Sequence, residues 1–140
     1  MMRCLLSCAI TISTLVNTAA AWEGPYNLTL ESNTSGDYNP DLAHDSLGNL
    51  HFVWTDSTAN IRHMIRYSDG AWSPITRVSV GQSNANWTRC TMDIWNNLHV
   101  VWHNGSTLAG SEVYYRKRNA DGTWGSVINL SNSGGIASIY

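Results

Sequence analysis

The chain contains 140 residues, of which 43% are hydrophobic and 13% are charged. This length accommodates a single domain, and seven tryptophans and six tyrosines beside one phenylalanine are typical of a globular β-rich protein rather than a disordered chain. The formal net charge of −2 argues against a nucleic-acid partner, which would require a clustered basic face.

The first 21 residues have the pattern of a signal peptide. A short positive segment ending at Arg3 precedes an apolar run from Cys4 to Val16, and a stretch of small residues ends at Ala21. We therefore predict cleavage near Ala21 and a secreted, periplasmic or extracellular location. The apolar run has 13 residues, fewer than the roughly 20 that a spanning helix needs, so no membrane span is predicted. Two of the three cysteines leave with this leader, so Cys90 has no disulfide partner within the mature chain.

An internal repeat of about 50 residues is the most informative feature of the sequence. The segment 45–54 returns 48 positions later as 93–102, with Asp, Asn, Leu, His, Val and Trp at matching places. A second anchor, the sequence Asp-Gly-x-Trp, occurs at 69–72 and returns 52 positions later at 121–124. Agreement over this span indicates that the chain contains two copies of one structural unit.

The change of spacing indicates an insertion of four residues in the second copy. Matching Tyr67 with Tyr115 at the spacing of 48 places this insertion between Tyr115 and Asp121. The basic cluster Arg116–Arg118 is then expected at a solvated hairpin tip.

Each copy is expected to form four short strands, separated by turns rich in Gly, Asn and Asp-Gly. In the first copy the strands are predicted near 41–45, 49–56, 61–68 and 72–80, and the second copy covers 87–131 in the same way. An additional outer strand is predicted at 22–30, because Trp22 to Leu28 matches the last strand of both copies. The predicted fold class is therefore all-β, built from four-stranded antiparallel units.

Four-stranded units that repeat at this period, with Gly and Trp at fixed places, are typical of β-propeller blades. The Leu-His-x-Val-Trp segments and the Asp-Gly-x-Trp turns resemble the sialidase-like propellers that carry Asp-box (BNR) repeats. The turns are two residues tighter between Asp and Trp than the family pattern Ser-x-Asp-x-Gly-x-x-Trp, so they are degenerate boxes. They consist of Asp69, Gly70 and Trp72 in the first copy and Asp121, Gly122 and Trp124 in the second.

The resemblance implies a partial propeller over 22–140, with the outer strand at 22–30 and blades at 41–80 and 87–131. A propeller closes with about four to eight blades, and two blades alone leave two apolar faces uncovered. Two explanations stay open: a truncated reading frame, or a homo-oligomer in which several copies complete one ring.

Polar and aromatic residues are expected to gather at one end of the strands, where the connections between blades lie. Carboxylate, guanidinium and indole groups together suit a sugar, because polar groups bond its hydroxyls and an indole stacks on its apolar face. The candidate ligand-binding residues are Asp41, Asp56, Trp87, Arg89, His103 and Asn104. We predict glycans as the partner, with no cofactor and no metal site, because His51 and His99 occupy matching strand positions of neighbouring repeats and are better explained by packing.

These observations predict an exported, sialidase-like propeller segment that binds carbohydrate without catalysis. The family resemblance implies an arginine cluster, a tyrosine nucleophile activated by Glu, and an Asp acid/base, and this set is not found, so no catalytic residue is assigned. Glu112 and Tyr114 share a strand face and are the one carboxylate–tyrosine pair considered. One alternative is a fragment of an exo-sialidase, or of another glycoside hydrolase, whose catalytic residues lie in missing blades. A second is a structural or adhesive surface module.

Overall fold

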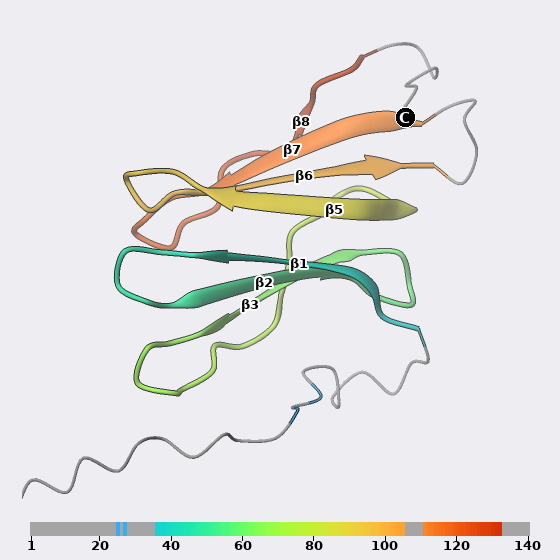
Figure 1. Ribbon diagram of the computed structural model, residues 1–140. Helices are drawn as coiled ribbons and strands as arrows, with labels where there is room; N and C mark the ends of the chain where they lie inside the picture. The colour runs from blue at the N-terminus through green and yellow to red at the C-terminus, as the bar shows by residue number, and fades with distance from the viewer. Residues whose placement is uncertain (1–24, 26, 28–35, 106–110, 133–140) are drawn as a thin grey trace, which may run out of the picture. The chain divides into compact units, whose positions relative to one another are not determined.

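The computed structural model describes residues 25, 27, 36–105 and 111–132, and the chain divides into two units, Met1–Leu30 and Glu31–Tyr140 (Figure 1). The predicted signal peptide (1–21) lies outside the described residues. So does the predicted outer strand (22–30), except for Pro25 and Asn27. In the described part of the chain no helix has the length and apolarity needed to cross a membrane.

The second unit contains two antiparallel sheets of four strands each, which agrees with the all-β, four-stranded prediction. The strands of each sheet are hydrogen-bonded in chain order. The first sheet contains β1 (Tyr38–His44), β2 (Leu50–Thr55), β3 (Ile61–Arg66) and β4 (Thr76–Arg77). The second sheet contains β5 (Ala85–Met92), β6 (Leu98–Asn104), β7 (Glu112–Arg118) and β8 (Ile128–Asn129).

The last strand of each sheet is shorter than the sequence indicates. A strand was expected over 72–80, whereas β4 contains two residues and is preceded by an isolated bridge between Trp72 and Arg66. Pro74 lies between this bridge and β4, and because proline has no N–H it cannot donate to the sheet. An equivalent bridge precedes β8 in the second sheet.

The strand registers correct the predicted position of the insertion. Leu50 pairs with Arg66 in the first sheet, and Leu98 pairs with Arg118 in the second. The spacing of 52 therefore already holds for the third strand of each sheet, which places the four extra residues in the connection between β6 and β7. The counterpart of Tyr115 is consequently His63, not Tyr67. The cluster Arg116–Arg118 lies within β7 rather than at a hairpin tip.

The repeated Asp-x-x-x-Asn sequences form the turns between the first two strands of each sheet. In the first sheet, Asp45 Oδ1 accepts hydrogen bonds from the N–H groups of Leu47 (2.9 Å) and Asn49 (2.8 Å), and its Oδ2 accepts from Asn49 Nδ2 (2.7 Å). Asn49 Oδ1 accepts in turn from the N–H of Ser68 (2.9 Å), in the neighbouring Asp-Gly turn. A short polar side chain that bonds nearby backbone in this way favours a turn. The second sheet repeats the arrangement with Asp93 and Asn97.

The core lies between the two sheets, and the face of each sheet that contributes to it is called its inner face. On β2 this face carries His51, Val53 and Thr55, and on β6 it carries the residues at even positions, because side chains alternate along a strand. Eight buried side chains form the core cluster: Ala43, Val53, Ile61, Val78, Ala85, Leu98, Val100 and Trp102. The opposite face of each sheet is called its outer face.

The two sheets form separate layers, and β1 lies next to β5 (Figure 1). Asn39 Nδ2 donates to Asn86 Oδ1 (3.1 Å), and the N–H of Cys90 donates to Asp41 Oδ2 (2.8 Å). At the other side of the core, Arg116 Nη1 in β7 donates to the carbonyl oxygen of Val78, which directly follows β4 (3.0 Å). The sheets are therefore joined by hydrogen bonds on both sides of the apolar core.

Candidate functional site

Two of the six predicted binding residues, Trp87 and His103, come together where β5 begins and β6 ends. Asn86 pairs with His103 across these two strands, and Asn104 follows His103. The indole ring of Trp87 lies 6.2 Å from the imidazole of His103, measured between ring centroids, with 38° between the planes. We call the surface formed by Asn86, Trp87 and His103 the Trp87 surface.

Trp87 is presented to solvent by an irregularity in β5. The strand register shifts between Asn86 and Arg89, so the β5–β6 pairing is bulged there. Trp87 has a φ of 52°, in the left-handed region, and its side chain is 62% exposed. Asn86 Oδ1 accepts from the N–H of Trp87 (3.0 Å) and from Asn39 Nδ2 (3.1 Å), which holds the bulge against β1.

The same irregularity occurs in β1 with a residue that suits it better. The β1 register shifts between Tyr38 and Asp41, and Asn39, 48 positions before Trp87, also has a φ of 52°. Asparagine tolerates the left-handed region, whereas a bulky aromatic residue adopts it at a cost. Backbone strain of this kind concentrates at sites of function. A strained and exposed tryptophan at the start of β5 is therefore a strong candidate for ligand contact.

His103 supplies a polar ring beside this indole. Burial lowers the pKa of His103, so the imidazole is neutral at physiological pH, and its buried Nδ1 has no hydrogen-bond partner among the described residues. Asn104 lies on the inner face of β6, opposite the buried Ala85, and its Nδ2 donates to Gln82 Oε1 (3.3 Å). The surface therefore combines an apolar ring with uncharged hydrogen-bonding groups.

Asp41, Asp56 and Arg89 are placed differently. Asp56 is 5% exposed, and its carboxylate accepts from Thr58, Asn60 and Arg62, with 2.6 Å to Arg62 Nε. Asp41 accepts from the backbone N–H groups of Leu42 and Cys90. These two carboxylates thus hold a turn and the β1–β5 contact. Arg89 lies beyond the bulge of β5, exposed, with Nη1 donating to the carbonyl oxygen of Thr88 (2.8 Å).

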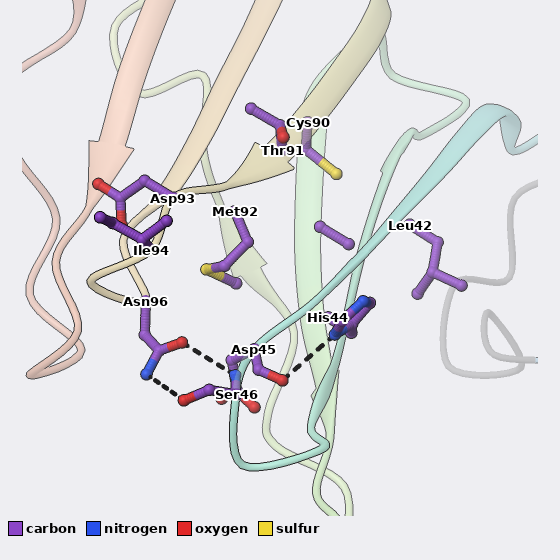
Figure 2. Close-up of a pocket in the computed structure, with 11 residues that line it drawn as sticks. Leu42, His44, Asp45, Ser46, Cys90, Thr91, Met92, Asp93, Ile94 and Asn96 are labelled. Carbon is purple, nitrogen blue, oxygen red and sulfur yellow. Dashed lines mark hydrogen bonds between the residues drawn. The ribbon is translucent and has the colours of Figure 1, made fainter.

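A groove of about 380 Å³ lies between β1 and β5, at the ends of the strands opposite to the Trp87 surface. Figure 2 shows Cys90 and Met92 reaching it from β5, and Leu42 and His44 from β1. Burial, followed by the charge of Asp41, raises the pKa of the Cys90 thiol to about 12, so this thiol is neither a nucleophile nor a metal-binding thiolate at neutral pH. Among the described residues, no three His, Cys, Asp or Glu side chains are placed to hold a metal ion.

The sequence analysis missed a hydrogen-bonded chain on the outer face of the second sheet. His99 Nε2 lies 3.1 Å from Asp93 Oδ2, and His99 Nδ1 lies 2.8 Å from the Tyr115 hydroxyl. Because a carboxylate only accepts, Nε2 carries the proton, and in the neutral ring Nδ1 then accepts from Tyr115. The repeated Asp-x5-His spacing, also present at Asp45 and His51, was the signal that could have revealed this chain.

The hydrogen bonds that join Asp93, His99 and Tyr115 do not activate the Tyr115 hydroxyl. Burial, followed by the charge of Asp93, raises the pKa of the Tyr115 hydroxyl, which opposes formation of a phenolate nucleophile. Tyr114 is stacked on Trp102, with 6.0 Å between ring centroids, and Glu112 accepts a hydrogen bond from the Ser131 hydroxyl. Neither tyrosine of β7 is therefore arranged as a nucleophile.

A scan against models of protein families finds no matching family, and a search of curated proteins finds no match. The chemistry of the Trp87 surface is consequently the basis on which a function can be inferred.

Proposed function

We propose that the chain is an exported segment of a sialidase-like β-propeller that binds carbohydrate through the Trp87 surface without cleaving it. The architecture is supported by two four-stranded antiparallel sheets of matching register, whose first strands lie side by side. The observation that carries the binding activity is Trp87, which is 62% exposed although its backbone adopts a strained conformation.

The Trp87 surface offers the contacts that a saccharide requires. An exposed indole can stack on the apolar C–H face of a pyranose ring, while neighbouring polar groups bond its hydroxyls. His103 lies beside the ring, and Arg89 lies beyond the bulge on the same strand as Trp87. An arginine also suits the carboxylate of an acidic sugar, because it can form two parallel hydrogen bonds with it.

The arrangement of the carboxylates supports binding rather than hydrolysis. Most glycosidases place two carboxyl groups on either side of the bond that they cleave. Asp56 is buried and bonded within its own turn, and Asp41 is bonded to the backbone of β1 and β5. Both acidic residues among the predicted binding residues thus form hydrogen bonds that stabilise the fold.

The test is a glycan array probed with the mature chain, followed by calorimetric titration of the best ligand. Trp87→Ala should weaken binding by at least tenfold, because removal of the stacking ring leaves only hydrogen bonds that compete with water. Trp95→Ala is the matched control, since Trp95 is also exposed (71%) but lies on the β5–β6 turn at the other end of the strands.

Absence of binding by the folded chain to every glycan would contradict the proposal and favour a structural or adhesive module. Turnover of a fluorogenic sialoside by the same sample would instead favour the glycosidase alternative. An equal loss of affinity in Trp87→Ala and Trp95→Ala would show that the binding site does not lie on the Trp87 surface.

A further inference from the structure

The interface between the two sheets shows how one repeat of this chain packs on the next. The second sheet places Leu98, Val100 and Trp102 in the shared core. Next to them, the Trp124 ring and the imidazole of His63 in the first sheet pack in a T-shaped arrangement, with 5.4 Å between centroids and 82° between planes. The second sheet thus presents an apolar face with a tryptophan at its side, and the first sheet receives it on β2 and β3.

The outer face of the first sheet carries the counterparts of the presenting residues. Leu50, Phe52 and Trp54 lie 48 positions before Leu98, Val100 and Trp102, and Trp72 lies 52 positions before Trp124. They point away from the second sheet, because His51, Val53 and Thr55 occupy the inner face of the same strand; Leu50 and Phe52 are half-buried, and Trp54 is 6% exposed. On the edge strand of this outer face, Leu42 pairs with Phe52 and is 51% exposed.

The outer face of the second sheet carries the counterparts of the receiving residues. His99 and Val101 correspond to His51 and Val53, and Tyr115 corresponds to His63. The similarity includes polar contacts, since His99 bonds Asp93 and Tyr115 as His51 contacts Asp45 and His63. These outer-face side chains are partly exposed, whereas their counterparts in the first sheet are buried.

We propose that a second copy of this chain docks the outer face of its first sheet on the outer face of the second sheet of the first copy. Trp72 of one copy would then meet Tyr115 of the next, as Trp124 meets His63 within one chain. This contact would continue the internal interface, because the two outer faces carry the counterparts of the residues that meet between the two inner faces. The inference does not depend on carbohydrate binding.

Charged side chains at the edges are compatible with this contact. Arg66 is the counterpart of Arg118, whose charge acts on His51 beside Asp45 in the internal interface. In the contact between copies, Arg66 would therefore approach His99. Lys117 replaces Ile65 on the receiving face, and the aliphatic part of a lysine can cover an apolar surface while its ammonium group stays in water.

Such an interface joins two different faces. Any assembly that is not a closed ring therefore has one free face of each kind, one at each end. Assembly therefore continues until a ring closes, or it forms an open chain. This property distinguishes the proposed contact from a symmetric dimer, in which both copies use the same face.

The experiment measures the mass of the mature chain by light scattering and sedimentation across micromolar concentrations. Leu42→Lys places a charge on the presenting face. Thr91→Arg places one on the receiving face, because Thr91 pairs with His99 and is the counterpart of the buried Ala43. Both positions are exposed in one chain, so folding should be preserved, and near-ultraviolet circular dichroism checks this. Leu47→Lys, at an exposed turn, is the matched control.

The wild-type chain and the control should form assemblies larger than a dimer, and each face variant alone should be monomeric. An equimolar mixture of the two variants should double in mass and stop there, because one intact face of each kind remains. A monomeric wild-type chain at all concentrations would overturn the proposal. Wild-type assembly that persists in both face variants, or a mixture that stays monomeric, would also overturn it.

Discussion

At the scale of single residues, His63 and Tyr115 occupy equivalent positions and make equivalent contacts. His63 Nε2 lies 3.1 Å from His51 Nδ1, and the Tyr115 hydroxyl lies 2.8 Å from His99 Nδ1. Burial is the main cause that lowers the pKa of His63 to about 3, and the charges of His51 and Arg118 act in the same direction. Burial also lowers the pKa of His51. The inner face of the first sheet therefore requires both rings to be neutral.

This requirement has a consequence for the pH dependence of stability. In the unfolded chain a histidine binds a proton below about pH 6.5, whereas folded His63 does so only near pH 3. The unfolded state therefore binds more protons between these values, and the free energy of unfolding falls as the pH falls, by at most about 1.4 kcal/mol per pH unit for one proton. The loss should begin below pH 6.5, before the carboxylates titrate.

His63→Tyr should reduce this loss, because the second sheet already has tyrosine at the equivalent position. The measurement is urea unfolding between pH 7 and pH 4, with His44→Asn, at an exposed position of β1, as the control for replacement of a histidine. Equal slopes for His63→Tyr and the wild-type chain would contradict the assignment of the pH dependence to the buried histidine.

At the scale of the elements, the turns were predictable and the strand irregularities were not. The Asp-x-x-x-Asn turns follow from local side-chain chemistry, which the sequence displays directly. The bulge at Trp87 has no local signal, because tryptophan disfavours the left-handed region and the conformation is held by Asn86 and by Asn39 of another strand. The position of the insertion was missed for a similar reason, since the β6–β7 pairing, not the identity of Tyr67 and Tyr115, sets the register.

The bulge of β5 provides a test of backbone strain at Trp87. Trp87→Asn introduces the residue that β1 has at the same place, so it should raise the free energy of unfolding by about 1 kcal/mol while removing carbohydrate binding. Chemical denaturation of both proteins measures the change. Asn39→Ala should have the opposite effect on stability, because alanine tolerates a φ of 52° less well than asparagine does. A Trp87→Asn variant less stable than the wild type would contradict the presence of strain.

At the scale of the whole molecule, comparison of the sequence with itself predicted two units of four antiparallel strands, because period and turn chemistry are repeated along the chain. The candidate site was less predictable. Trp87 and His103 come together because β5 pairs with β6, whereas Asn104 points to the opposite face of the sheet. The carboxylates of Asp41 and Asp56 accept hydrogen bonds from other groups of the folded protein and therefore do not contribute to this surface. The positions of these residues in the sequence do not indicate which of them lie on the surface and which form hydrogen bonds within the protein.

The most direct test of carbohydrate binding at the Trp87 surface is nuclear magnetic resonance of the tryptophan indole N–H groups during a glycan titration. The account predicts that the Trp87 signal, assigned from its loss in Trp87→Ala, shifts in a saturable manner, whereas the signals of Trp95 and of the buried Trp102 stay in place. Shifts centred on Trp95, or no shift of the Trp87 signal with any glycan, would contradict it.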